Sequence, residues 1–236
     1  MRVLVVGGAG HVGSIIRSAL EQQHACRYFD LRPVPGAEDR TIVADVNDDP
    51  AVAKSLVDVD ALVYLAMGKP PRTRDCSEID GMFIVNVIGF YRFLWHALHA
   101  GVRRIVYASS LSVYQKLYEG LPRDESIAAD SFAAYGVTKR LGEQMCLAGA
   151  QQHPDATIVA LRLMFPQDEE GWAKRDPSKQ HWLGALGPQD TRRLFLAAVA
   201  CNRPGAHIVQ ASGDTDGQSF PNTAATELLD WRPLGD

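Results

Sequence analysis

The stretch Met1-Arg-Val-Leu-Val-Val-Gly-Gly-Ala-Gly-His-Val-Gly-Ser14 decides the fold of this chain. Val3 to Val6 form a short apolar, β-branched run, which predicts a strand buried on both faces. Glycines follow at the spacing G-x-x-G-x-x-G, and apolar residues then recur at helical intervals from Ile15 to Leu20. This order predicts a dinucleotide site, because the glycines let the backbone approach the phosphates and the helix N-terminus offers free N–H groups. The alternative is a tight turn between strand and helix that binds nothing.

The bulk composition is that of an ordinary globular protein, with 236 residues of which 46% are hydrophobic and 22% charged. A net charge of −4 indicates neither nucleic acid nor an anionic membrane surface as a partner. No run approaches the roughly 18 apolar residues that a membrane-spanning helix needs. The four cysteines form no Cys-x-x-Cys pair, so we expect reduced thiols and a cytoplasmic protein.

Apolar runs and helical patterns alternate along most of the chain. Strands are predicted at residues 3–6, 27–30, 41–46, 61–66, 104–108 and 157–163, and helices at 49–57, 79–100 and 132–149. This alternation predicts an α/β fold with a doubly wound parallel sheet. After Leu163 the pattern changes: a loop or lid is expected at 166–187, then a helix at 189–200, a strand at 207–211 and a helix at 223–229. We therefore expect a dinucleotide-binding domain at 1–165 and a small substrate-binding lobe at 166–236.

The choice of dinucleotide depends on Asp30, which ends the second predicted strand about 20 residues after the glycines. A carboxylate there accepts bonds from the adenosine ribose hydroxyls and repels a 2′-phosphate, so it favours NAD. Arg32 keeps NADP as the less favoured alternative, and a plain turn residue before Pro33 is the interpretation without a ligand. Asp45 and Val46 end the third predicted strand, where the adenine would lie.

A second motif, Tyr135-Gly-Val-Thr-Lys139, indicates catalysis. On a helix the tyrosine and the lysine share one face. A nearby ammonium stabilises the phenolate and is expected to lower the tyrosine pKa below its ordinary value of about 10. The pair then moves a proton to or from a substrate hydroxyl, with Ser110 as a hydrogen-bond donor to the same oxygen. A surface pair four residues apart is the alternative.

These motifs resemble a known family, the extended short-chain dehydrogenase/reductases of the NAD-dependent epimerase/dehydratase group. The resemblance rests on Gly7 to Gly13, Leu65-Ala66, Asn86-Val-Ile-Gly89, Ala108 to Tyr114, the Tyr135 motif and the tail from Asn222 to Pro233. It implies a Rossmann fold, Ser110, Tyr135 and Lys139 as catalytic residues, and a lysine that also bonds the nicotinamide ribose. The cofactor-binding residues that we expect are Gly7, Gly10, His11, Val12, Gly13, Asp30, Asp45, Val46, Leu65, Ala66, Asn86, Tyr135 and Lys139.

The expected substrate region departs from the usual family pattern. Family members usually exceed 300 residues, and the small-residue loop after the sixth strand is replaced by Met164 to Trp172. Length and the stretch from His181 to Asp190 are similar to uronate dehydrogenases, although Leu111-Ser112 stand where those enzymes carry Asn-His. As substrate contacts we expect Ser110, Arg162 and Trp172, the arginine because guanidinium matches an anionic group.

The function that follows is an NAD-dependent oxidoreductase or epimerase acting on a hydroxyl of a sugar, uronate or nucleotide sugar. The alternative from another class is a regulator that senses a dinucleotide without turnover. No metal site is expected, because His96 and His99 lack a third ligand and Asp168 to Glu170 are typical of a solvated turn. The helices around 86–98 and 135–147 are expected to pair across a homodimer.

Overall fold

The computed structural model describes residues 1–69 and 76–235. Its strands are β1 (Arg2–Val6), β2 (Ala25–Asp30), β3 (Thr41–Val43), β4 (Ala61–Tyr64), β5 (Arg104–Ser110), β6 (Thr157–Leu163) and β7 (Gly205–Ala211). Its α-helices are α1 (His11–Gln23), α2 (Asp49–Ser55), α3 (Cys76–Phe83), α4 (Phe90–His99), α5 (Ala134–Gln152), α6 (Glu169–Ala173), α7 (Pro188–Ala200) and α8 (Thr223–Leu229).

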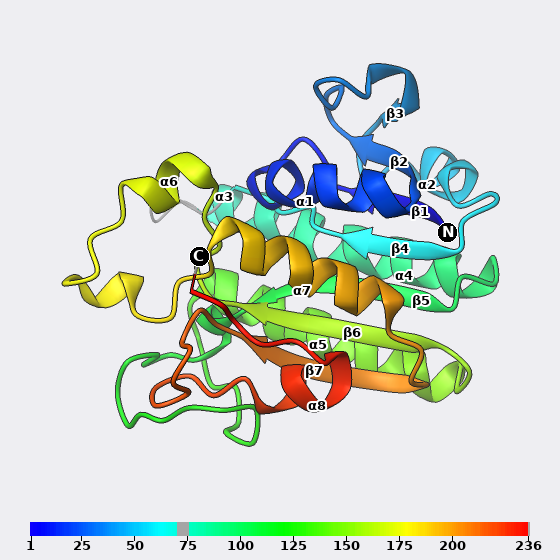
Figure 1. Cartoon of the computed structure of the whole chain (residues 1–236). Coiled ribbons are helices and arrows are strands. Elements are labelled where there is room, and N and C mark those ends of the chain that lie inside the picture. The colour runs from blue at the N-terminus through cyan, green and yellow to red at the C-terminus, as the bar shows by residue number, and fades with distance from the viewer. Residues whose placement is uncertain (70–75, 236) are drawn as a thin grey trace.

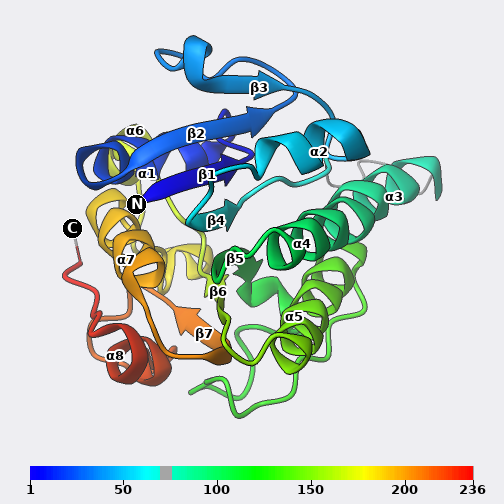
Figure 2. The ribbon, with the colours of Figure 1, turned by 90° about the vertical axis from the view of Figure 1, so that its right-hand side faces the viewer.

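All seven strands form one parallel sheet in the order β3-β2-β1-β4-β5-β6-β7. Helices α1 and α7 cover one face and α2, α4 and α5 cover the other (Figures 1 and 2). The predicted α/β fold with a doubly wound parallel sheet is therefore confirmed. The strand order reverses between β1 and β4, and in such sheets ligands bind at the carboxyl ends of the strands beside that reversal.

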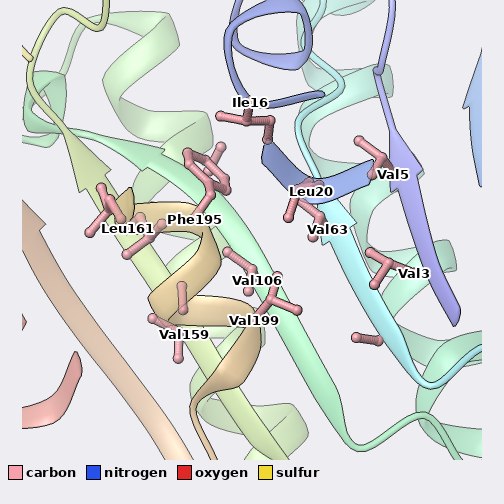
Figure 3. Packing of buried hydrophobic residues seen from close by; sticks show 14 of the residues in the cluster. Val3, Val5, Ile16, Leu20, Val63, Val106, Val159, Leu161, Phe195 and Val199 are labelled. Atoms are coloured by element: carbon pink, nitrogen blue, oxygen red, sulfur yellow. The ribbon is translucent and has the colours of Figure 1, made fainter. Parts of the chain in front are cut away.

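The glycine stretch lies at the centre of the core. Val3 and Val5 of β1 pack toward α1 and α7, while Leu4 and Val6 belong to the cluster on the other face of the sheet. Figure 3 shows the first cluster closed by Phe195 and Val199 of α7. Since both faces of β1 are buried, its near-continuous apolar sequence is what a parallel central strand requires.

The segment after residue 165 contributes to the same sheet and core. Strand β7 pairs with β6 along its whole length, and α7 packs against α1. The buried Asp190 carboxylate accepts the backbone N–H groups of Leu234 and Gly235 at 2.9 and 3.0 Å, which ties the chain end to α7. Because β7 and α7 belong to the same sheet and core as the first 165 residues, the expected substrate-binding role of residues 166–236 stays a prediction.

One helical stretch, Ile79–His99, is long and apolar enough to cross a membrane by length and composition, although the sequence analysis expected no such run. It includes a six-residue π-helical segment at Ile84–Gly89. Phe90, Phe93 and Leu94 are buried in the core of the sheet. We interpret the stretch as a helix of the fold that packs one side into this core, while Ile84, Ile88, Tyr91 and Trp95 on its other side are exposed.

Candidate active site

A cavity of about 1270 Å³ is lined by residues at the carboxyl ends of the central strands. At one end, called the Asp30 end, it is lined by Asp30, Arg32, Asp45 and Val46. At the other, called the Tyr135 end, it is lined by Ser110, Tyr135 and Lys139. The turn between β1 and α1 also lines the cavity. The place of the cavity therefore agrees with the dinucleotide site that the sequence predicted.

The turn between β1 and α1 is packed too closely for side chains. Gly7 has φ +86°, and a Cβ on it would lie 2.6 Å from the backbone nitrogen of Ala66. A Cβ on Gly13 would lie 2.4 Å from the carbonyl oxygen of Gly8. Helix α1 begins directly after Gly10 without a side-chain cap, which leaves its first N–H groups facing the cavity. These features fit a phosphate group.

At the Asp30 end, the Asp30 side chain both makes a structural hydrogen bond and lines the cavity. Its Oδ2 accepts the backbone N–H of Ala9 at 2.9 Å, which fastens the glycine turn to β2. Its side chain also lines the cavity, where ribose hydroxyls would reach it. Arg32 donates from Nη2 to the carbonyl of Ala9 at 3.0 Å. This bond holds the Arg32 guanidinium next to the glycine turn. Arg32 also lines the cavity.

At the Tyr135 end, strand β5 and helix α5 bring three predicted residues together. Ser110 ends β5 and caps the short turn that follows, accepting the N–H of Ser112 at 3.1 Å. Lys139 is 4% exposed, and its Nζ donates to the carbonyl of Ala108 at 2.7 Å. The same Nζ lies 5.6 Å from the ring centre of Tyr135. Tyr135 and Lys139, four residues apart in the sequence, are therefore close in space, as the sequence predicted.

The charges at this end depart from the sequence-based expectation. Burial raises the pKa of Tyr135 above its ordinary value, and hydrogen bonding with Ser110 only partly opposes this rise. Burial also lowers the pKa of Lys139 to about 8, with Glu143 acting in the opposite direction. The expected lowering of the Tyr135 pKa is wrong, because taking the phenolate out of water destabilises it more than the hydrogen bond with Ser110 stabilises it.

Two predicted contacts are structural supports. Arg162 is buried and donates from Nε and Nη2 to the two oxygens of Glu143, both at 2.8 Å. Its guanidinium is therefore paired with Glu143 and does not face a substrate. Asn86 accepts the N–H of Gly68 at 2.8 Å and donates to Thr138 at 2.9 Å. Neither residue is among the described residues that line the cavity. The strand-end position of Arg162 suggested exposure to substrate, but its side chain enters the interior.

Trp172 also lies outside the described cavity wall. It belongs to the five-residue helix α6, and the Arg175 guanidinium covers its ring at 4.2 Å. The other predicted cofactor residues do line the cavity: Gly7, Gly10, His11, Val12, Gly13, Asp30, Asp45, Val46, Leu65, Ala66, Tyr135 and Lys139. The segment between β4 and α3 lies in part, at residues 70–75, outside the described residues.

Part of the cavity wall comes from Met164 to Gln167 together with His181. The sequence analysis expected the substrate region here but named only Trp172 of this segment as a contact. Phe165 adopts φ +41°, which is uncommon for a non-glycine residue and often marks a functional site. His11 donates from Nε2 to the carbonyl of Pro166 at 2.9 Å and so connects the glycine turn to this wall. A change of sequence pattern after β6 was the only available signal.

Comparison with known proteins agrees with this geometry. The family model "NAD dependent epimerase/dehydratase family" matches residues 3–166. An L-arabinose 1-dehydrogenase (NAD(P)(+)) of Haloferax volcanii is 30% identical over 98% of this chain and 96% of its own length. A uronate dehydrogenase of Pseudomonas syringae pv. tomato is 31% identical over 98% of this chain and 81% of its own.

Solved structures share the fold. A structure described as a mutated uronate dehydrogenase superposes with a TM-score of 0.82 and 25% identity, over 99% of this chain and 81% of that one. A short-chain dehydrogenase/reductase superfamily protein from Agrobacterium tumefaciens with bound NAD also gives 0.82, at 23% identity, over 99% of this chain and 92% of that one.

Proposed function

Because the chain belongs to the NAD-dependent epimerase/dehydratase family, we propose that it is a dehydrogenase that oxidises a hydroxyl of a free sugar or uronate. The observation that carries the proposal is one continuous cavity with a dinucleotide-type glycine turn at its middle and Ser110, Tyr135 and Lys139 at one end. Two relatives that match 98% of this chain are sugar or uronate dehydrogenases, which favours net oxidation over epimerisation.

The cofactor in this proposal is NAD, with NADP less favoured. The glycine turn and the start of α1 would hold the pyrophosphate, and Asp30 would bond the adenosine ribose. Asp45 and Val46 would flank the adenine, and Lys139 and Tyr135 the nicotinamide ribose. The nicotinamide supplies a hydride acceptor when bound.

The protein's own part in the reaction is to move a proton at one hydroxyl. The Tyr135 oxygen takes the hydroxyl proton while Ser110 donates a hydrogen bond to the same substrate oxygen. The buried Lys139 ammonium stabilises the negatively charged Tyr135 oxygen before the transfer, and the oxygen is neutral once it has taken the proton. Since burial raises the pKa of Tyr135 and lowers that of Lys139, proton transfer depends on how well the ammonium is kept charged.

The direct test is to incubate the purified protein with NAD and a panel of aldoses and uronic acids, and to follow NADH absorbance at 340 nm. We expect NADH formation with at least one pyranose that carries a free anomeric hydroxyl. NAD binding without turnover of any panel member would contradict the proposal and would favour the dinucleotide-sensing regulator. The comparisons support the enzyme, since the relatives named above are dehydrogenases.

A homodimer is proposed on the exposed face of one helical stretch. Ile84, Ile88, Tyr91 and Trp95 are between 42% and 55% exposed and recur at intervals of three or four residues. Leu141 and Leu147 of the neighbouring α5 are exposed as well. Such a stripe suits pairing with a second copy. Light scattering of Ile88→Asp/Trp95→Glu should give half the mass of the wild type, and equal masses would contradict the dimer.

A cytoplasmic location remains part of the proposal. Cys26, Cys146 and Cys201 are free and buried, which suits a reducing compartment. Fractionation of cells that produce the tagged protein would test it, with recovery in the membrane pellet as the contrary result.

A further inference from the structure

Helix α5 carries a third polar residue on the face that holds Tyr135 and Lys139. Glu143 lies four residues beyond the lysine. The residue is buried, with 3% of its surface exposed. It is not among the described residues that line the cavity. A carboxylate taken out of water in this way needs partners, because burying an unpaired charge costs several kcal/mol.

Strands β5 and β6 supply those partners. Glu143 Oε1 accepts the Ser109 hydroxyl at 2.7 Å and Arg162 Nε at 2.8 Å, and Oε2 accepts Arg162 Nη2 at 2.8 Å. Ser109 and Arg162 are paired in the β5–β6 register, so both side chains reach the same face. Arg162 Nη1 also donates to the Tyr114 hydroxyl at 2.6 Å. The carboxylate is therefore fixed in position by two strands.

This arrangement determines the charges next to Tyr135. Arg162 and Glu143 cancel each other, which leaves the Lys139 ammonium as the net positive charge of the cluster. Burial raises the pKa of the other titratable groups that act on the cluster, and the tyrosines and the thiol among them stay neutral. These groups are Tyr107 of β5, Cys146 of α5, Tyr64 of β4, Tyr114 and Glu125, of which Glu125 acts on Arg162. Lys139 itself donates to the Ala108 carbonyl, which carries no charge. Glu143 is thus the anion that favours the charged lysine.

We propose that Glu143, held by Arg162 and Ser109, is a positioning residue that keeps Lys139 charged beside Tyr135 during proton transfer. The inference rests on the proposed function for its catalytic consequence. Its physical content does not, because the protonation of Lys139 is measurable without substrate. A guanidinium remains charged at any ordinary pH. Removing the carboxylate alone would therefore leave two buried cations, of which only Lys139 can lose its proton.

The test is the titration of Lys139 in protein labelled with ¹³Cε-lysine, followed by NMR and assigned with Lys139→Arg. In the wild type we expect a pKa of about 8. In Glu143→Gln we expect it to fall by about one unit or more. The alkaline limb of kcat/KM should move down by the same amount, so that activity at pH 7.5 falls about threefold from this cause alone. Glu143→Asp keeps the charge and should keep the limb near its wild-type pH, even where kcat falls.

Two results would overturn the inference: an unchanged Lys139 pKa in Glu143→Gln, or a shifted pKa with an unmoved alkaline limb. Should Glu143→Gln fail to fold, Glu143→Gln/Arg162→Met removes both charges of the pair. The Lys139 pKa should then fall by less, because the lysine loses its anion but faces no stranded guanidinium, and an unchanged pKa would again overturn the inference. If no sugar is oxidised by the wild type, the proposed function fails. The NMR titration then still decides whether Glu143 controls the charge of Lys139.

Discussion

The two ends of the cavity are built in different ways. The Asp30 end and the glycine turn depend on backbone: glycines that admit no Cβ, the start of α1, and one carboxylate at a strand end. The Tyr135 end depends on buried side chains, with Lys139 next to the ion pair of Glu143 and Arg162. Backbone sites tolerate little added volume, whereas charge sites respond to a lost or added charge. Mutations at the two ends should therefore fail differently.

The largest expected effect belongs to Tyr135→Phe. The change keeps the ring packing and removes only the hydroxyl, so kcat should fall about 10²–10⁴-fold, the usual contribution of a positioned acid or base. The NAD dissociation constant should stay within about twofold, because the phosphate turn is untouched. Steady-state kinetics and a fluorescence titration with NAD check this. Near-full activity would remove Tyr135 from the mechanism.

The glycine turn should show the opposite result, a loss of binding. Gly13→Ala places a Cβ 2.4 Å from the Gly8 carbonyl oxygen, so the turn must shift. Overpacking of about 1–3 kcal/mol there corresponds to a loss of NAD affinity of about tenfold or more. Gly10→Ala should be milder, because a Cβ there would lie 3.1 Å from the Gly7 carbonyl oxygen. Gly149→Ala in α5 is the control, since Gly149 is not among the described residues that line the cavity and a Cβ there would first meet the end of the Leu98 side chain, at 3.1 Å. Equal affinities in all three would contradict this assignment of the turn.

Lys139→Met tests the cost of the charge at the Tyr135 end. The folded-state pKa of about 8 lies below the unfolded value of 10.5, so the wild type carries a penalty at pH 7 that disappears as the pH rises from 8 to 10.5. After the lost bond to Ala108 is subtracted, we expect the variant to be about 2 kcal/mol more stable at pH 7. Urea unfolding at pH 7 and 9.5 should show the gain shrinking, together with weaker activity and NAD binding at pH 7. A gain that is independent of pH would exclude this origin.

Asp30→Ala should change cofactor preference by a smaller amount. The variant loses the ribose acceptor and the bond to the Ala9 N–H, so NAD affinity should fall about fivefold to tenfold. NADP affinity should fall less, because the repulsion of a 2′-phosphate is also removed. Parallel titrations with both dinucleotides measure the ratio. A wild type that binds NADP as tightly as NAD would contradict the role given to Asp30.

Trp172→Ala should have the smallest effect on kinetics. Its ring packs against Arg175 outside the described cavity wall, so KM and kcat should change less than about twofold. Phe165→Ala in the cavity wall is the comparison and should raise KM more. A large rise in KM for Trp172→Ala alone would restore the tryptophan as a substrate contact.

The sequence by itself determined the sheet and most of the residues that line the cavity around the glycine turn. Local patterns were enough for this: the glycine spacing, the apolar strand runs and Asp30. Such patterns predict structure because a few neighbouring residues set the backbone geometry at each position. The proximity of Tyr135 and Lys139 was predictable for the same reason, since a separation of four residues on a helix fixes a shared face. The tail from Asn222 to Pro233 likewise matched a family pattern, and α8 forms there.

Only the tertiary structure decided what happens between distant segments. Arg162 and Asn86 carry chemistry typical of ligand contacts, but the register of β5 with β6 gives the arginine to Glu143, and the packing of α5 gives the amide to Thr138. The pKa of Tyr135 also depends on burial, which no local pattern records. Side-chain partners and desolvation are properties of the assembled interior, so the backbone cradle was predictable from sequence and the charges beside it were not.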